Sequence, residues 1–181
     1  MRNTRTFALW AAGFLAIVTL STNLPGSPIR VHAASLPKVT LHAESIAPRT
    51  IEQRTGEMVT HSYAQAWQDL ADCLDTNRTD LLGNYFTGGA KLRLTHLIAD
   101  QRKGSLRTHY EDHGHEVRAV FYSPDGGEMQ LEDRVQLEVQ VFDGQKLIYS
   151  ATAPGKYLVL MTPGPDRWYV RSLESVGTDA F

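Results

Sequence analysis

Two kinds of hydrophobic spacing, divided near Gly104, limit the folds that this chain can adopt. Between Tyr63 and Leu74 the apolar residues recur every three or four positions, which predicts an amphipathic helix. Between Met129 and Val141 they occupy every second position, with Asp133 as the exception, which predicts a strand with one buried face. Helical segments therefore come first and strands follow, an order typical of an α+β domain.

The expected elements are three helices and a set of antiparallel strands joined by tight turns. Gly104, which follows Arg102 and Lys103, is expected to end the third helix. Pro154–Gly155 predicts a bulge or bend within one strand. Together these elements predict a curved antiparallel sheet packed against an N-terminal helical group. The helices are expected at residues 60–74, 81–86 and 90–102, and the strands at 116–123, 128–142, 146–161 and 168–174.

Residues 1–33 have the three parts of a secretory signal peptide. Arg2 and Arg5 supply a positive start, Phe7–Leu20 is apolar except for one threonine, and the final tripeptide VHA fits a cleavage site. The apolar run is shorter than the roughly 20 residues that span a bilayer as a helix. We expect cleavage and an extracytoplasmic protein that is secreted, periplasmic or held in the cell envelope. Retention of the segment as an anchor is the alternative.

The rest of the chain divides into an arm and a domain. Residues 34–57 contain prolines and mixed polar residues without a sustained period, and are expected to form a linker or an extended arm lying on the domain. Residues 58–178 are expected to form the folded domain. Three of the 18 Lys and Arg residues precede residue 34, whereas all 20 Asp and Glu residues follow it. The exported part is therefore mildly acidic, which argues against nucleic acid or a membrane surface as a partner.

Cys73 is the single cysteine, so an internal disulfide is excluded. It lies between Leu70 and Leu74 on the apolar side of the first expected helix. We expect it to be a small buried side chain.

Two stretches resemble the nuclear-transport-factor-2-like superfamily. LLGNYFTGGAKLRLTHLIADQRKGS, residues 81–105, is similar to the second and third helices of secreted bacterial members, and WYVRSLESV, residues 168–176, is similar to their closing strand. The resemblance implies a cystatin-like cone in which three helices pack in the concave face of a strongly curved antiparallel sheet. It also implies a small-molecule cavity at the mouth of the cone and a homodimer formed through the outer sheet face. Isomerases, dehydratases, cyclases and binding modules share this fold, so it selects no function.

The stretch RTHYEDHGHEV, residues 107–117, places His109, His113 and His115 among three acids. On a strand, His113 and His115 would share a face and offer mixed ligands to a divalent metal with a neighbouring acid. Gly114 interrupts the cluster, and a flexible backbone does not preset ligand geometry. We expect a solvated loop between helix and strand, with no metal and no cofactor.

Asp133 is the one polar residue among the alternating positions that should face inward. A carboxylate in an apolar interior is a candidate general base. A bulge in the sequence EDR would instead turn it to solvent, where Arg134 or Arg118 is a possible partner. The Tyr-and-two-acids constellation of the family's isomerases cannot be laid onto this chain residue by residue.

Tyr63, Trp67, Tyr85 and Tyr110 are candidates, with Asp133, for the lining of a ligand pocket, although aromatic residues are equally typical of a core. The leading hypothesis is an exported, non-enzymatic domain that binds a small apolar ligand or a protein partner. One alternative is a small isomerase, dehydratase or cyclase-type enzyme with Asp133 as general base. Another is an assembly or dimerisation module that uses the outer sheet face, which would then be apolar.

Overall fold

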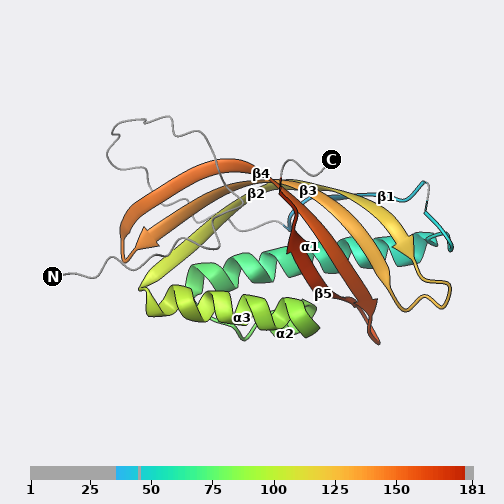
Figure 1. Cartoon of the computed structure of the whole chain (residues 1–181), viewed down its shortest axis with the longest axis horizontal. Helices are drawn as coiled ribbons and strands as arrows, with labels where there is room; N and C mark the ends of the chain where they lie inside the picture. Colours follow the sequence, from blue (N-terminus) through green and yellow to red (C-terminus); the bar gives the residue numbers. More distant parts are fainter. Residues whose placement is uncertain (1–35, 45, 178–181) are drawn as a thin grey trace.

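The computed structural model describes residues 36–44 and 46–177; the predicted signal segment lies outside them. A curved five-stranded sheet, in the order β1-β2-β3-β4-β5, arches over the helices α1 and α3 (Figure 1). This is the α+β cone expected from the change of period and from the family resemblance. The elements are β1 (Val39–His42), α1 (Gln53–Thr76), α2 (Leu82–Tyr85), α3 (Gly88–Lys103), β2 (Leu106–Tyr122), β3 (Met129–Asp143), β4 (Lys146–Pro163) and β5 (Trp168–Ser175).

The segment expected as a linker or arm supplies β1 and the start of α1. β1 pairs with β2 in parallel, with Val39 beside His115 and Leu41 beside Val117. The sheet is therefore mixed, whereas the sequence predicted a wholly antiparallel one. A strand of four residues is too short to show a period in the sequence, which is why the pattern missed it.

The prediction of a solvated loop at residues 107–117 was wrong, because β2 runs through the whole histidine cluster. The register shifts between Asp112 and His115, and Gly114 takes a φ of +115° there, a backbone conformation that favours glycine. Beyond this bulge, pairing resumes with His115 opposite Val135 of β3. The bulge accommodates Gly114 in β2, and after it the side chain of His115 faces the concave side of the sheet.

Pro154 does not interrupt β4, which stays paired with β3 on both sides of it; Pro154 lies opposite Gln136. The Val176 N–H donates to the Lys156 carbonyl, so Lys156 directs its backbone polar groups toward β5. Pro154, two residues earlier, faces the same side but lies beyond the last β5 pairing within the described ranges. Its missing N–H therefore costs no ladder bond, as is usual for proline on a strand edge.

The core lies between α1 and the concave face of the sheet. The backbone of α1 approaches β1, β2 and β5 most closely, and that of α3 approaches β2 and β5. Cys73 is fully buried and α3 ends at Lys103 with Gly104 at its C-cap, so both expectations are confirmed. A second register shift, between Ala119 and Phe121, turns Tyr122 inward and leaves Phe121 37% exposed. Within the described ranges, no helix is both long and apolar enough to cross a membrane.

Candidate functional site

Four polar side chains from three elements meet inside the cone. The Tyr63 hydroxyl of α1 donates to Asp133 Oδ2 of β3 at 2.7 Å. On β2, His115 joins the same oxygen through Nδ1 at 2.8 Å and reaches Asp112 Oδ2 through Nε2, also at 2.8 Å. Tyr63, His115 and Asp133 are each 1% exposed. The regular alternation of β3 therefore carries Asp133 inward as predicted.

The electrostatics of this buried cluster favour a charged histidine. Burial alone lowers the pKa of His115, but hydrogen bonds and charge attraction from Asp112 and Asp133 outweigh it and raise the pKa to about 9. At neutral pH both ring nitrogens therefore donate, one to each carboxyl group. Burial and the nearby Asp133 hold the pKa of Tyr63 well above its ordinary value, so its hydroxyl stays a neutral donor.

One oxygen of the cluster has no partner. Asp133 Oδ1 is buried and accepts no hydrogen bond from any residue in the described part of the chain. An unpaired buried acceptor costs about 1–3 kcal/mol. Among the described residues it is therefore the acceptor of the cluster that is left with a hydrogen bond to make.

Aromatic rings surround the cluster. Trp67 packs on His115 with ring centroids 4.8 Å apart and meets Tyr157 edge-on at 5.3 Å. Burial raises the pKa of Tyr110 to about 12. The pKa of Tyr157 is raised by burial first and then by Tyr110 and Asp133, and Tyr157 lies opposite Asp133 in the pairing of β3 with β4.

The structure thus gathers Tyr63, Trp67, Tyr110 and Asp133, but not Tyr85. The guanidinium of Arg167 lies over the Tyr85 ring at 5.2 Å, away from the cluster. Tyr157 was missed by the sequence reasoning. It sits directly opposite Asp133 in the register of β3 and β4, a pairing that no local pattern specifies.

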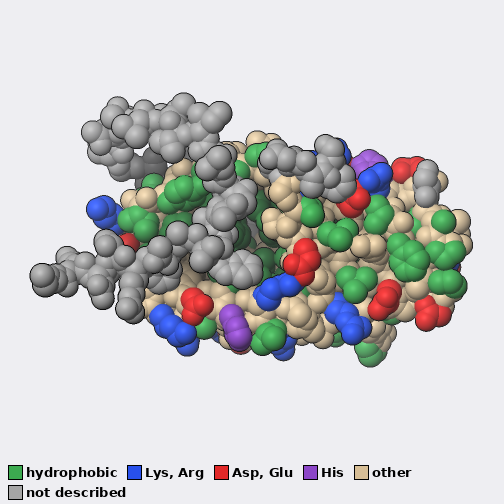
Figure 2. Space-filling view, viewed as in Figure 1, with side chains coloured by type: hydrophobic (Ala, Val, Ile, Leu, Met, Phe, Trp, Pro, Cys, Tyr) green, Lys and Arg blue, Asp and Glu red, His purple; other side chains and the backbone are tan. Residues whose placement is uncertain are grey.

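Further along β3 and β4, toward the turn that joins them, the concave face of the sheet is apolar and its side chains are only partly buried. Val139 of β3 lies opposite Ala151 of β4, and Val141 lies opposite Tyr149, which is 43% exposed. The side chains of Val139, Val141 and Ala151 are only partly buried here. Figure 2 shows hydrophobic side chains set back in a hollow between the positions that α3 and β4 occupy in Figure 1.

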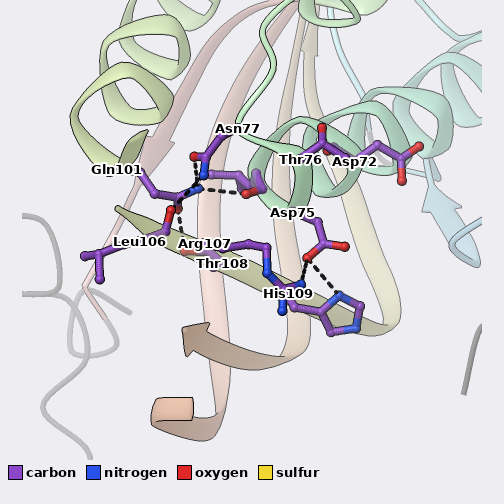
Figure 3. A network of polar contacts seen from close by, with 10 residues as sticks. Asp72, Asp75, Thr76, Asn77, Gln101, Leu106, Arg107, Thr108 and His109 are labelled. Carbon is purple, nitrogen blue, oxygen red and sulfur yellow. Dashed lines mark hydrogen bonds and ion pairs between the residues drawn. The ribbon is translucent and has the colours of Figure 1, made fainter. Parts of the chain in front are cut away.

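The other two histidines of the sequence cluster lie elsewhere. His109 of β2 has its Nδ1 3.7 Å from Asp75, which lies at the end of α1 and also pairs with Arg107 (Figure 3). His113 is exposed on β2. In the part of the chain that the structure describes, no group of three or more His, Cys, Asp or Glu residues is arranged to hold a metal ion.

The fold can be compared with that of solved structures. The intermembrane-space region of the chloroplast protein ARC6 superposes with a TM-score of 0.61 at 15% identity, covering 72% of this chain and 100% of that one. The Kfla4162 protein from Kribbella flavida gives 0.49 at 14% identity, covering 68% and 93%. A putative scytalone dehydratase from Novosphingobium aromaticivorans gives 0.49 at 12% identity, covering 69% and 89%.

No protein-family model and no curated protein matches the sequence. At these identities, structural similarity shows the fold and leaves the activity open. The chain has an α+β cone fold, shared with the ARC6 region, as the resemblance to the nuclear-transport-factor-2-like superfamily implied.

Proposed function

We propose that the domain binds a small, largely apolar ligand in the mouth of the cone, with Asp133 as the polar anchor. The observation that carries this proposal is the unpartnered Oδ1 of Asp133, buried beside a concave face rich in aromatic and aliphatic side chains. Binding sites for small molecules combine such apolar walls with a few fixed polar groups. A ligand whose apolar part covers the mouth, and whose N–H or O–H group reaches inward past Leu137 and Val135, would satisfy the oxygen.

The outer side of β3 favours this proposal over an assembly role. The outward positions of β3 between Gln130 and Gln140 are all polar or charged. An assembly face should be apolar at its centre. On β4 the same face carries Leu158 and Leu160, opposite Glu132 and Gln130, so it is the β3 side that argues against a homodimer.

N-phenyl-1-naphthylamine, an apolar fluorophore with a single N–H donor, tests the proposal by fluorescence titration. Ala151→Trp fills the mouth from the concave side of β4 and should abolish binding. Thr152→Trp places the same ring on the outer side of the same strand and should leave binding unchanged. Asp133→Asn should weaken binding about tenfold, because an amide N–H would replace the free acceptor. Equal binding by Ala151→Trp and Thr152→Trp would refute the proposal.

An acid–base enzyme is the second candidate, favoured by the same free oxygen. Tyr63 and His115 hold Asp133 in a fixed orientation, as a general base requires. Both nitrogens of His115 are already engaged by carboxyl groups, so the histidine itself has no position left for a substrate. Catalysis would therefore depend on Asp133 alone. This candidate would be favoured if the protein converted a bound ketone or hydroxy compound and the Asp133→Asn variant did not.

We propose an extracytoplasmic location on the signal-like pattern of residues 1–33. Intact-mass measurement of the protein purified from its native host tests it. A mass that begins at Ala34 supports export with cleavage, and a mass that includes residues 1–33 contradicts cleavage.

A further inference from the structure

A second surface, separate from the mouth of the cone, lies between β1 and the first half of α1. This β1–α1 groove has a volume of about 600 Å³. Its floor, formed by β1 and the residues flanking it, is apolar, and its five polar side chains come from α1 and the N-cap of that helix. It is lined by Leu36, Pro37, Val39, Leu41, Ala43, Ile51, Glu52, Gln53, Gly56, Glu57, Thr60, His61 and Ala64.

The strand that forms one wall of the groove has a free edge. Among the described residues, β1 pairs only with β2. The Lys38 carbonyl accepts the His115 N–H at 2.8 Å, so Lys38 directs its backbone polar groups toward β2. Because successive residues of a strand face opposite sides, Val39 and Leu41 direct their N–H and C=O groups away from β2. These groups can pair with an added strand.

The helix that forms the other wall leaves room for the side chains of such a strand. Gly56 contributes no side chain, and an added Cβ there would only touch Ile51 and Leu41 at 3.6 and 3.7 Å. Ala64, further along α1, is buried and small. A strand lying along β1 would therefore point every second side chain onto an apolar floor.

The charged side chains that line the groove indicate which kind of strand would bind there. The ionisable groups lining the groove are Glu52, Glu57 and His61, and no Lys or Arg lines it. Glu52 is paired with Arg49, whereas exposed Glu57 accepts a hydrogen bond only from the neutral Gln53 within the described ranges. A cationic side chain on the incoming strand would complement Glu57.

We propose that the β1–α1 groove docks an extended segment of a partner protein, which adds as a strand to β1. The segment has apolar side chains at alternate positions and a Lys or Arg that reaches Glu57. Main-chain hydrogen bonds to Val39 and Leu41 supply affinity, and the apolar floor and Glu57 supply specificity, as in other strand-addition sites. A second copy of the chain is the alternative occupant, because Lys38 directly precedes its own β1 residues, VTLH; the sedimentation measurement below distinguishes it from a partner protein.

Selection of a random peptide library on the immobilised full chain tests this, followed by fluorescence anisotropy with the fluorescein-labelled selected peptides. We expect selected peptides to alternate apolar residues and to contain Lys or Arg. Glu57→Lys should weaken their binding about fivefold or more, and Thr60→Trp, which fills the groove, should abolish it. Glu111→Lys makes the same charge change at an exposed site on β2 and should have no effect. Hydrogen exchange of the Val39 and Leu41 amides should slow when the peptide binds.

Several results would overturn the proposal. One is the selection of no peptide, or of peptides that Glu57→Lys binds as tightly as the parent. Slow exchange of the Val39 and Leu41 amides before any peptide is added would show that the groove is filled from within the same chain. A change from dimer to monomer in Thr60→Trp, measured by sedimentation, would assign the groove to a second copy.

Discussion

The buried ion cluster predicts a specific loss of stability at alkaline pH. The pKa of His115 is about 9 in the folded protein and 6.5 for an ordinary histidine. One pH unit of pKa difference corresponds to about 1.4 kcal/mol, so the folded state gains about 3 kcal/mol from binding this proton. Because the folded-state pKa is the higher one, this contribution is fully present below pH 6.5. It is lost as the pH rises through about 9.

The perturbation that isolates this effect is Asp112→Asn. It removes one of the two carboxyl groups that hold the His115 proton, so the pKa of His115 should fall toward its ordinary value. At pH 6 the variant should be less stable by about 2 kcal/mol, the usual worth of a hydrogen bond to a charged group. The free energy of unfolding should also change less between pH 6 and pH 9.5 in the variant than in the parent.

Urea denaturation at a series of pH values, followed by tryptophan fluorescence, measures both quantities. Subtracting the variant from the parent removes the contributions of groups that the substitution leaves alone. Asp143→Asn, at an exposed position at the end of β3, is the control and should keep the parent's pH dependence. Parallel curves for the parent and Asp112→Asn between pH 6 and 9.5 would refute the charged-histidine account.

Three further predictions concern packing. Gln101→Leu should destabilise the fold by about 2–4 kcal/mol in urea titrations, because the buried amide bonds the end of α1 and accepts from Thr108 (Figure 3); a loss below 0.5 kcal/mol would contradict this. Gly155→Ala should cost about 1–2 kcal/mol, since its Cβ would lie 3.0 Å from two neighbouring side chains, while Gly177→Ala, in open space, should be neutral. Cys73 should react with a thiol reagent only after denaturant is added, and rapid labelling of the native protein would show that it is not buried.

The sequence predicted those features of the fold that depend on local period. The alternation from Met129 to Val141 specifies which side of β3 is buried. β3 has no bulge near Asp133, so the Asp133 carboxyl faces inward, as the alternation predicts. The helical stripe that contains Tyr63 and Trp67 is buried for the same reason. Such patterns report the faces of an element and need no knowledge of its neighbours.

The features that escaped prediction depend on pairing between distant segments. His115 is buried because a bulge at Gly114 shifts the register of β2. In the sequence, the polar residues around His115 are typical of a loop, so the strand was not predicted. Tyr157 joins the site because β4 pairs with β3 in one register among several that the sequence allows. The four-residue β1 depends on its parallel partner. Pro154 is tolerated because of where β5 ends.

The most direct test of the proposed binding site is a methyl NMR spectrum of the full chain with and without N-phenyl-1-naphthylamine. The account predicts shifts at the methyl groups of Val139 and Ala151, which face each other on the concave side of β3 and β4. The methyl groups of Leu158, on the outer side of β4, should stay in place. Shifts at Leu158 without shifts at Val139 and Ala151, or no shifts at all, would contradict a ligand site at the mouth of the cone.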